Sequence, residues 1–256
     1  MPATPRAASS AVLLPEAFTP SARRALTRTD PVLAEMMRKV GPFRLELRPL
    51  HSPFAALAES IVYQQLHGRA AATIFGRLSE RVGKGEGFTP EALLATPDPA
   101  LREAGLSGAK AASLKDLAQK TRDGAVPTLA EVHRLSNEEL IERFTLVRGI
   151  GQWTVEMLLI FRLGRPDVLP VDDFAIRKGF QRLMGLEESP RPREVLAHGE
   201  RWRPWRTVAS WYLWRSLELP EAQESPRGAA SSRPQSPQAR TSKARTSSAV
   251  TRRKSS

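Results

Sequence analysis

Cysteine is absent from this sequence of 256 residues. The absence excludes a disulfide-stabilised scaffold, a cysteine-ligated zinc site, an iron–sulfur cluster and a thiol nucleophile. The four histidines are scattered along the chain and lack the short spacing of a pair of metal ligands. The sequence therefore predicts neither a transition-metal centre nor thiol chemistry.

Long hydrophobic runs are also missing. The longest, at residues 157–161, falls far short of the roughly 18 apolar residues that a membrane-spanning helix needs. The apolar patch at 11–14 is too short for the core of a signal peptide, although the arginine-rich leader around it leaves an organelle transit peptide open. We expect no interaction with membranes.

Acidic residues are outnumbered by basic ones, 27 against 39, which gives a net charge of +12 and a pI near 10.9. Half of this excess, +6, lies in residues 221–256. A basic surface attracts phosphate polyanions because binding releases their counterions. The charge is thus consistent with a nucleic-acid partner, and the alternative, that it serves solubility alone, is equally open.

The two ends of the chain differ in composition from its middle. The C-terminal segment is rich in serine, arginine, alanine, glutamine and proline, and we predict a disordered basic tail over residues 219–256. This tail either holds nucleic acid nonspecifically or only keeps the protein in solution. Residues 1–29 are rich in alanine, proline, serine and arginine, and we predict a poorly ordered leader there.

Between these ends, residues 30–218 show the spacing of apolar residues that is typical of helices. The stretch 53–81 is helical, and Gly68 is a point at which it can divide into two helices. The only candidate strand is the short alternation at 43–47. The sequence therefore predicts an all-α domain.

Residues 138–163 have the pattern of two helices joined by a tight turn. In this turn Gly149 and Gly151 bracket Ile150, which we expect to anchor the turn in the core. The free N–H groups at the start of the second helix suit a phosphate. The pattern is typical of a helix-hairpin-helix that holds a DNA backbone without reading bases, and an ordinary helix–helix connection is the alternative for this motif alone.

Residues 164–184 form a loop rich in glycine and proline followed by another helix. Asp172 and Asp173 stand at the start of that helix, where its dipole and free N–H groups stabilise negative charge. One of them can cap the helix while the other points out of its end. Taken alone, two acids at a helix start are usually only capping or first-turn residues that stabilise the helix.

The combination of these motifs resembles the helix-hairpin-helix base-excision DNA glycosylase superfamily, and most closely its DNA-3-methyladenine glycosylase II branch with the single-domain relatives. Two further segments are similar to this family. Residues 61–72 look like its minor-groove wedge region, and residues 200–214 look like its C-terminal helix. The resemblance covers residues 30–218 and implies an all-α fold of two helical lobes, with the active-site cleft between them.

The resemblance also implies an activity: hydrolysis of the N-glycosidic bond of alkylated purines such as 3-methyladenine, after base flipping, to leave an abasic site. In the family the catalytic carboxylate is the second of the paired acids, which is Asp173 here, and Asp172 then caps or orients the helix. A fixed anion can stabilise the positive charge that develops on the sugar. Alkylated purines are already cationic, so their departure requires no second catalytic carboxylate.

By the same resemblance, a flipped base is held between aromatic side chains. Trp153 and Trp214 are the main candidates for this pocket, and Tyr63 and Trp211 are weaker ones. Core packing is the alternative for the tryptophans within residues 202–214. In relatives that also cleave the DNA strand, the position of Trp153 holds a lysine that forms a Schiff base. The tryptophan predicts a glycosylase without lyase activity.

The remaining assignments concern DNA. The resemblance places Gln65 as the wedge that fills the gap left by the flipped base, although a solvent-facing glutamine is the alternative. It implies that the hairpin contacts DNA and binds Na⁺ or K⁺ through backbone carbonyls, with no other cofactor required. The hairpin residues expected at DNA are Arg148, Gly149, Ile150 and Gly151, and the carbonyls are those of Thr145, Val147 and Ile150.

We therefore expect a monomer that acts on double-stranded DNA containing alkylated bases. Its location would be the bacterial cytoplasm, at the nucleoid, or the nucleus of a eukaryotic cell. Two alternatives are a noncatalytic helix-hairpin-helix DNA-binding module and a glycosylase for another damaged base.

Overall fold

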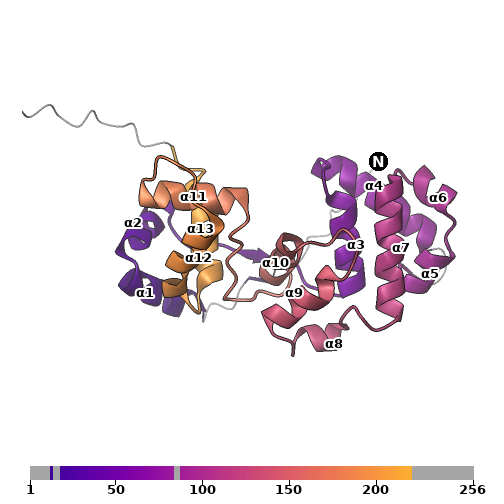
Figure 1. Ribbon diagram of the computed structural model, residues 1–256, viewed down its shortest axis with the longest axis horizontal. Coiled ribbons are helices and arrows are strands. Elements are labelled where there is room, and N and C mark those ends of the chain that lie inside the picture. The colour runs from indigo at the N-terminus through magenta and orange to yellow at the C-terminus, as the bar shows by residue number, and fades with distance from the viewer. Residues whose placement is uncertain (1–11, 14–17, 84–86, 221–256) are drawn as a thin grey trace, which may run out of the picture. The chain divides into compact units, whose positions relative to one another are not determined.

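The computed structural model describes residues 12–13, 18–83 and 87–220, which are almost entirely helical (Figure 1). Two short strands, β1 (Val12–Leu13) and β2 (Glu46–Leu47), pair antiparallel, and β2 lies within the predicted strand candidate. The all-α class is confirmed. No helix in these described residues is long and apolar enough to cross a membrane.

One group of helices combines both ends of the described chain. Helix α2 packs against α11 and α13, so segments far apart in sequence share one core (Figure 1). The helices of this group are α1 (Phe18–Thr29), α2 (Pro31–Val40), α11 (Phe174–Met184), α12 (Pro192–Gly199), the 3-10 turn η1 (Glu200–Trp202) and α13 (Arg206–Ser216).

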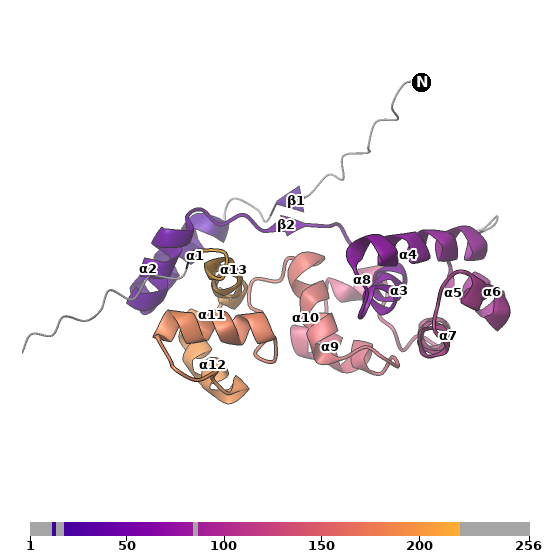
Figure 2. The same cartoon turned by 90° about the horizontal axis from the view of Figure 1, so that it is seen from above.

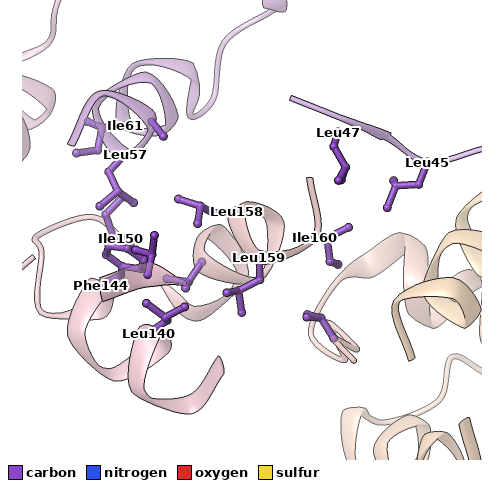
Figure 3. Close-up of a cluster of buried hydrophobic side chains, with 14 of the residues drawn as sticks. Leu45, Leu47, Leu57, Ile61, Leu140, Phe144, Ile150, Leu158, Leu159 and Ile160 are labelled. Carbon is purple, nitrogen blue, oxygen red and sulfur yellow. The ribbon is translucent and has the colours of Figure 1, made fainter. Parts of the chain in front are cut away.

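A second group contains the middle of the chain, with α7 packed against α3, α5 and α6 (Figure 2). Leu57 and Ile61 from α3 face Phe144 from α9 and Leu158 from α10, in a continuous apolar core (Figure 3). The two helical lobes are thus confirmed. The helices are α3 (Pro53–Tyr63), α4 (Gly68–Val82), α5 (Pro90–Ala95), α6 (Asp98–Glu103), α7 (Gly108–Arg122), α8 (Leu129–Val132), α9 (Asn137–Thr145) and α10 (Gln152–Phe161).

The predicted leader is wrong for residues 18–29, which form helix α1. Ala22 and Leu26 lie one turn apart and are fully buried against the first group, so tertiary packing holds a segment whose composition suggested disorder. The predicted start of the tail at residue 219 is wrong, since Leu219 is described and its carbonyl accepts a hydrogen bond from Arg182. The rest of the leader and residues 221–256 lie outside the described part of the chain.

Asp30 joins the N-terminal and C-terminal elements of the first group. It caps α2 by accepting from the Leu33 N–H (3.0 Å), and it also accepts from His198 Nε2 (2.7 Å) and Trp202 Nε1 (2.8 Å). Burial opposes its ionisation, but the bonds from Leu33, His198 and Trp202 outweigh burial and lower the pKa of Asp30. The Asp30 side chain is only 2% exposed and Trp202 is fully buried, so the Trp202 N–H has no water to replace the carboxylate as its partner.

Replacing Asp30 with alanine should destabilise the protein by about 3 kcal/mol, because it leaves buried donors unpaired and removes a helix cap. Glu35→Ala, at an exposed position of the same helix, should cost less than about 1 kcal/mol. Urea denaturation of both variants measures the difference. Equal losses in the two variants would contradict the proposed importance of the Asp30 network.

Candidate active site

Asp173 is the residue that caps helix α11. Its Oδ1 accepts the Ile176 N–H at 2.8 Å, and the helix begins at the next residue, Phe174. The predicted cap at Asp172 is therefore wrong, because the helix starts too late for Asp172 to reach its first free N–H groups. Asp172 is exposed, and no hydrogen bond of the described residues involves its side chain.

Two tryptophans from other helices also donate to the Asp173 carboxylate. Trp153 Nε1, at the start of α10, lies 2.7 Å from Oδ2, and Trp214 Nε1, in α13, lies 3.2 Å from Oδ1. The structure thus brings together the three residues that the sequence analysis placed at the centre of the site. With the Ile176 N–H, three donors from three helices fix the orientation of one carboxylate.

The contact between α11 and α13 depends on Gly179. A Cβ atom added there would lie 2.4 Å from the carbonyl oxygen of Leu213, so the two helices meet backbone to backbone. Trp214 follows Leu213 directly and reaches Asp173 across this close contact. Any larger residue at position 179 would separate the tryptophan from the carboxylate.

A cavity of about 660 Å³ is lined by side chains of α3, α10 and the β2 segment. Trp153, which donates to Asp173, is one of its walls, whereas Asp173 and Trp214 are not among the lining residues. Tyr63 and Trp153 are among its walls, as predicted, together with Phe161, which the sequence analysis did not single out. Trp153 is 48% exposed, so its ring is available to a ligand. Trp214 stacks on Phe161 at 5.7 Å between ring centroids and extends this aromatic wall toward Asp173.

The structure does not bring Trp211 to this cavity. Its ring is buried and packs edge-on against Phe43 (5.0 Å) and Tyr212 (5.0 Å), and it is not among the lining residues. The physical reason is the helical period. Trp211 precedes Trp214 by three residues and contacts different aromatic rings. Because α13 is buried on nearly all sides, Trp211 packs into the core there.

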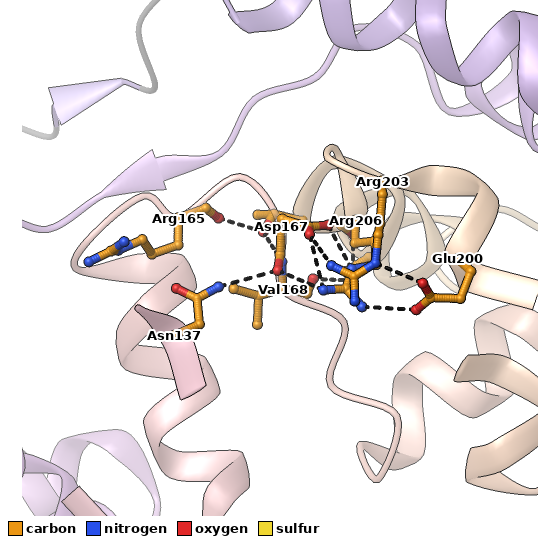
Figure 4. Close-up of polar contacts among 9 residues, drawn as sticks. Asn137, Arg165, Asp167, Val168, Glu200, Arg203 and Arg206 are labelled. Carbon is orange, nitrogen blue, oxygen red and sulfur yellow. Dashed lines mark hydrogen bonds and ion pairs between the residues drawn. The ribbon is translucent and has the colours of Figure 1, made fainter. Parts of the chain in front are cut away.

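The loop that leads to Asp173 is held by a charged network that the sequence analysis did not predict (Figure 4). Asp167 accepts from Arg203 Nη1 (2.6 Å) and Arg206 Nε (2.6 Å). Thr207 and Ser210 of α13 then bind the backbone of Val168. The arginines of this segment therefore fix the loop, and their spacing in sequence gave no sign of a partner 36 to 39 residues away.

The predicted hairpin lies between α9 and α10. Ile150 is buried as expected, whereas Arg148, Gly149 and Gly151 are exposed. Gly149 has a φ of +80°, which a side chain would resist, while Gly151 has an ordinary φ of −98°. No side chain of the described residues caps α10, which leaves its first N–H groups open to an anion.

The predicted wedge residue, Gln65, lies in an exposed turn at residues 64–67 between α3 and α4. Its φ of +57° is in the left-handed region that residues other than glycine rarely occupy. The neighbouring Gln64 lines the cavity and donates from Nε2 to the carbonyl of Gly149 at 2.8 Å. The turn thus connects the cavity to the hairpin.

Glu156 is a buried acid close to the two aspartates, and the sequence analysis missed it. It lies on α10, one turn after Gln152. The Nε2 of Gln152 donates a hydrogen bond to Glu156 Oε1 at 2.9 Å. Burial and, to a smaller extent, the charges of Asp172 and Asp173 raise the pKa of Glu156 to about 7, against the lowering effect of the Gln152 bond. A carboxyl that titrates near neutrality therefore lies behind the site.

Comparison with known proteins agrees with this geometry. A family model described as the HhH-GPD superfamily of base excision DNA repair proteins matches residues 58–204. DNA-3-methyladenine glycosylase 1 of Schizosaccharomyces pombe is 46% identical over 167 residues, which cover 65% of this chain and 73% of that protein. The alkylbase DNA glycosidase-like protein mag2 of the same yeast is 31% identical, over 77% of this chain and 93% of its own length.

Two solved structures are similar along most of the chain. The S. pombe 3-methyladenine DNA glycosylase Mag1, in complex with abasic DNA, has a TM-score of 0.68 and 40% identity, covering 80% of this chain and all of that one. A DNA-3-methyladenine glycosidase of Bacillus halodurans also has a TM-score of 0.68, with 35% identity, covering 76% of this chain and 88% of its own. In the described part of the chain, no cluster of His, Asp or Glu could hold a metal ion.

The raised pKa of Glu156 predicts a pH-dependent stability. Between the ordinary value of 4.5 and about 7, the folded protein keeps a proton that the unfolded chain releases. The stabilisation is therefore complete below pH 4.5 and is lost as the pH rises through about 7. Glu156→Gln, which stays neutral, should match the wild type at about pH 5 and exceed its free energy of unfolding by on the order of 2 kcal/mol at about pH 8.

Urea denaturation at both pH values checks this expectation. Glu142→Gln, on the exposed side of α9, is the matched control and should keep the pH dependence of the wild type. If Glu156→Gln keeps that dependence as well, Glu156 is not the titrating group.

Proposed function

The chain belongs to the HhH-GPD superfamily of base excision DNA repair proteins, and from this premise we propose that it hydrolyses the N-glycosidic bond of alkylated purines in double-stranded DNA. One observation carries the proposal. The Asp173 carboxylate is held by Trp153 and Trp214 beside a cavity with aromatic walls. An anion fixed next to a site for a flat, electron-poor base is the arrangement that this reaction needs.

The chemistry follows from these positions. The flipped base enters the cavity and stacks on the exposed face of Trp153, an interaction worth about 0.5–2 kcal/mol for a cationic ring. The bond between C1′ and the base nitrogen breaks, and its electron pair leaves with the purine and neutralises the positive charge of the alkylated base. The carboxylate of Asp173 stabilises the sugar cation, and water adds to C1′ and passes a proton to Asp173.

The enzyme acts without lyase activity. A strand-cleaving glycosylase needs an amine that attacks C1′. Trp153 occupies the position of that amine, and none of the residues that line the cavity is a lysine. The product is therefore an intact strand with an abasic site.

The hairpin and the turn at residues 64–67 bind the DNA. The free N–H groups at the start of α10 hold a backbone phosphate, and Gln65 fills the space that the flipped base leaves. The carbonyl oxygens of Thr145 and Ile150 accept no hydrogen bond from the described residues, and together with that of Val147 they suit a hard monovalent cation such as Na⁺ or K⁺. This cation would bridge the hairpin to the phosphate.

The protein acts as a monomer, since one chain supplies the carboxylate, the cavity walls and the DNA-binding hairpin. Its place in the cell is where the genome is, at the nucleoid of a bacterium or in the nucleus of a eukaryote. The alternative function is excision of other damaged bases, and an experiment must distinguish it from excision of alkylated purines.

A panel of duplexes, each with one lesion, tests the proposal. The panel contains 3-methyladenine, 7-methylguanine, 8-oxoguanine, hypoxanthine and uracil, and alkali reveals abasic sites. We expect excision of the methylated purines in preference to the others. Asp173→Asn should lose at least about a hundredfold in excision rate. Because asparagine caps helices as well as aspartate does, this variant should fold and still bind an abasic analogue.

Excision by Asp173→Asn at the rate of the wild type would overturn the catalytic assignment. A wild type that excises only oxidised or deaminated bases would overturn the substrate class and leave the role of Asp173 intact.

Substitutions at Trp153 separate its two roles. Trp153→Phe keeps an aromatic face but loses the N–H that donates to Asp173, so we expect a loss of about tenfold in single-turnover rate. Trp153→Lys loses the aromatic face and replaces the indole N–H with a flexible ammonium, so it should be slower still through the loss of stacking. Borohydride should trap no covalent complex with the wild type. Unchanged rates in both variants would show that Trp153 does not belong to the pocket.

A further inference from the structure

The exposed turn at residues 64–67 has a backbone that needs support. Among the described residues, Gln65 is the only one other than glycine with a positive φ. A left-handed residue with a side chain persists only where its surroundings hold it, and such positions concentrate at functional sites. The question is therefore which contacts hold this turn.

Lys110 of α7 supplies the first of these contacts. Its Nζ donates to the carbonyls of Val62 (2.7 Å) and Gln64 (2.8 Å), on either side of the end of α3. Carbonyls at the end of a helix lack partners within that helix, so the ammonium satisfies two of them at the entrance to the turn. Burial lowers the pKa of Lys110, and no ion pair of the described residues includes it. The ammonium is thus committed to these carbonyls.

The same face of α7 also holds the hairpin. Ser113 Oγ packs against Gly149, where an added Cβ would approach it to 3.0 Å, and Asp116 Oδ2 accepts the Arg148 N–H at 2.7 Å. Lys110, Ser113 and Asp116 are spaced by three residues, which places them along one side of a helix. The bond from Gln64 Nε2 to the carbonyl of Gly149 closes the connection between turn and hairpin.

We propose that Lys110 is a positioning residue that holds the Gln65 turn in a fixed relation to the hairpin. The wedge residue Gln65 and the phosphate-binding N–H groups of the hairpin then contact DNA as one rigid unit. Lys110 touches no substrate in this scheme and acts through Gln65. The inference rests on the proposed function, because a wedge has a purpose only in a protein that everts a base.

The chain contains a matched control on the same helix. Lys115 Nζ also donates to two carbonyls at the end of a neighbouring helix, those of Leu94 (2.8 Å) and Thr96 (2.6 Å) at the end of α5. It differs from Lys110 in the helix whose end it caps, because α5 leads to neither the turn at residues 64–67 nor the hairpin. The purely structural effect of removing such a lysine can therefore be measured at Lys115.

The experiment compares Lys110→Met with Lys115→Met in the full chain. Three quantities are measured: thermal stability, affinity for a duplex with a tetrahydrofuran abasic analogue, and base eversion from the fluorescence of a 2-aminopurine beside the lesion. We expect similar losses of thermal stability in both variants. Only Lys110→Met should lose affinity and eversion, by about tenfold, as expected for the loss of bonds from a charged donor.

A double-mutant cycle with Gln65→Ala tests whether Lys110 acts through the wedge. In the Gln65→Ala background, Lys110→Met should cause little further loss of eversion, because the wedge is already absent. Lys110→Arg, which keeps a charged donor, should recover part of the function. If Lys110→Met does not fold, Lys110→Gln, which removes the charge but stays polar, is compared in the same way with Lys115→Gln.

The inference is overturned if the Lys110 variant loses no more affinity and eversion than the Lys115 variant, or if its effect adds fully to that of Gln65→Ala. These readouts do not depend on excision. A wild type that everts a base but excises none would overturn the proposed function and leave the role of Lys110 standing, whereas an active wild type with equivalent lysine variants would overturn the role of Lys110 alone.

Discussion

The rest of the site depends on the carboxylate of Asp173 and the three N–H groups that hold it. These donors come from the backbone of α11 and from indoles on α10 and α13. Electrostatic stabilisation of a developing cation is effective when the anion is already oriented, because no reorganisation is needed during the reaction. The contact of α11 with α13 at Gly179 and the network around Asp167 both serve to bring these donors to one point.

The Asp173 side chain caps a helix and also accepts a hydrogen bond from Trp153, which is a wall of the cavity. This double role explains the limit of sequence reasoning. A pair of aspartates at a helix start predicts one cap and one free acid, but which is which depends on a boundary of a single residue. Local patterns did predict the hairpin and the division of 53–81 into two helices, and the family resemblance placed Trp153 and Asp173 in one site without predicting the hydrogen bond between them. They failed for α1, Trp211, Glu156 and the Asp167 network, because burial and partners distant in sequence decide those features.

In the proposed function, helix α10 connects the binding of DNA to the chemistry. Its free N–H groups face the hairpin side, its second residue is Trp153, and Phe161 at its last position closes the cavity wall. Because a helix is rigid over this length, the place where a phosphate binds fixes the place where a base can stack. Recognition of the backbone, which carries no sequence information, thus sets the position of the damaged base. Under the proposed function, lesion choice would fall to the aromatic walls and to Asp173, since both favour a base that is already cationic.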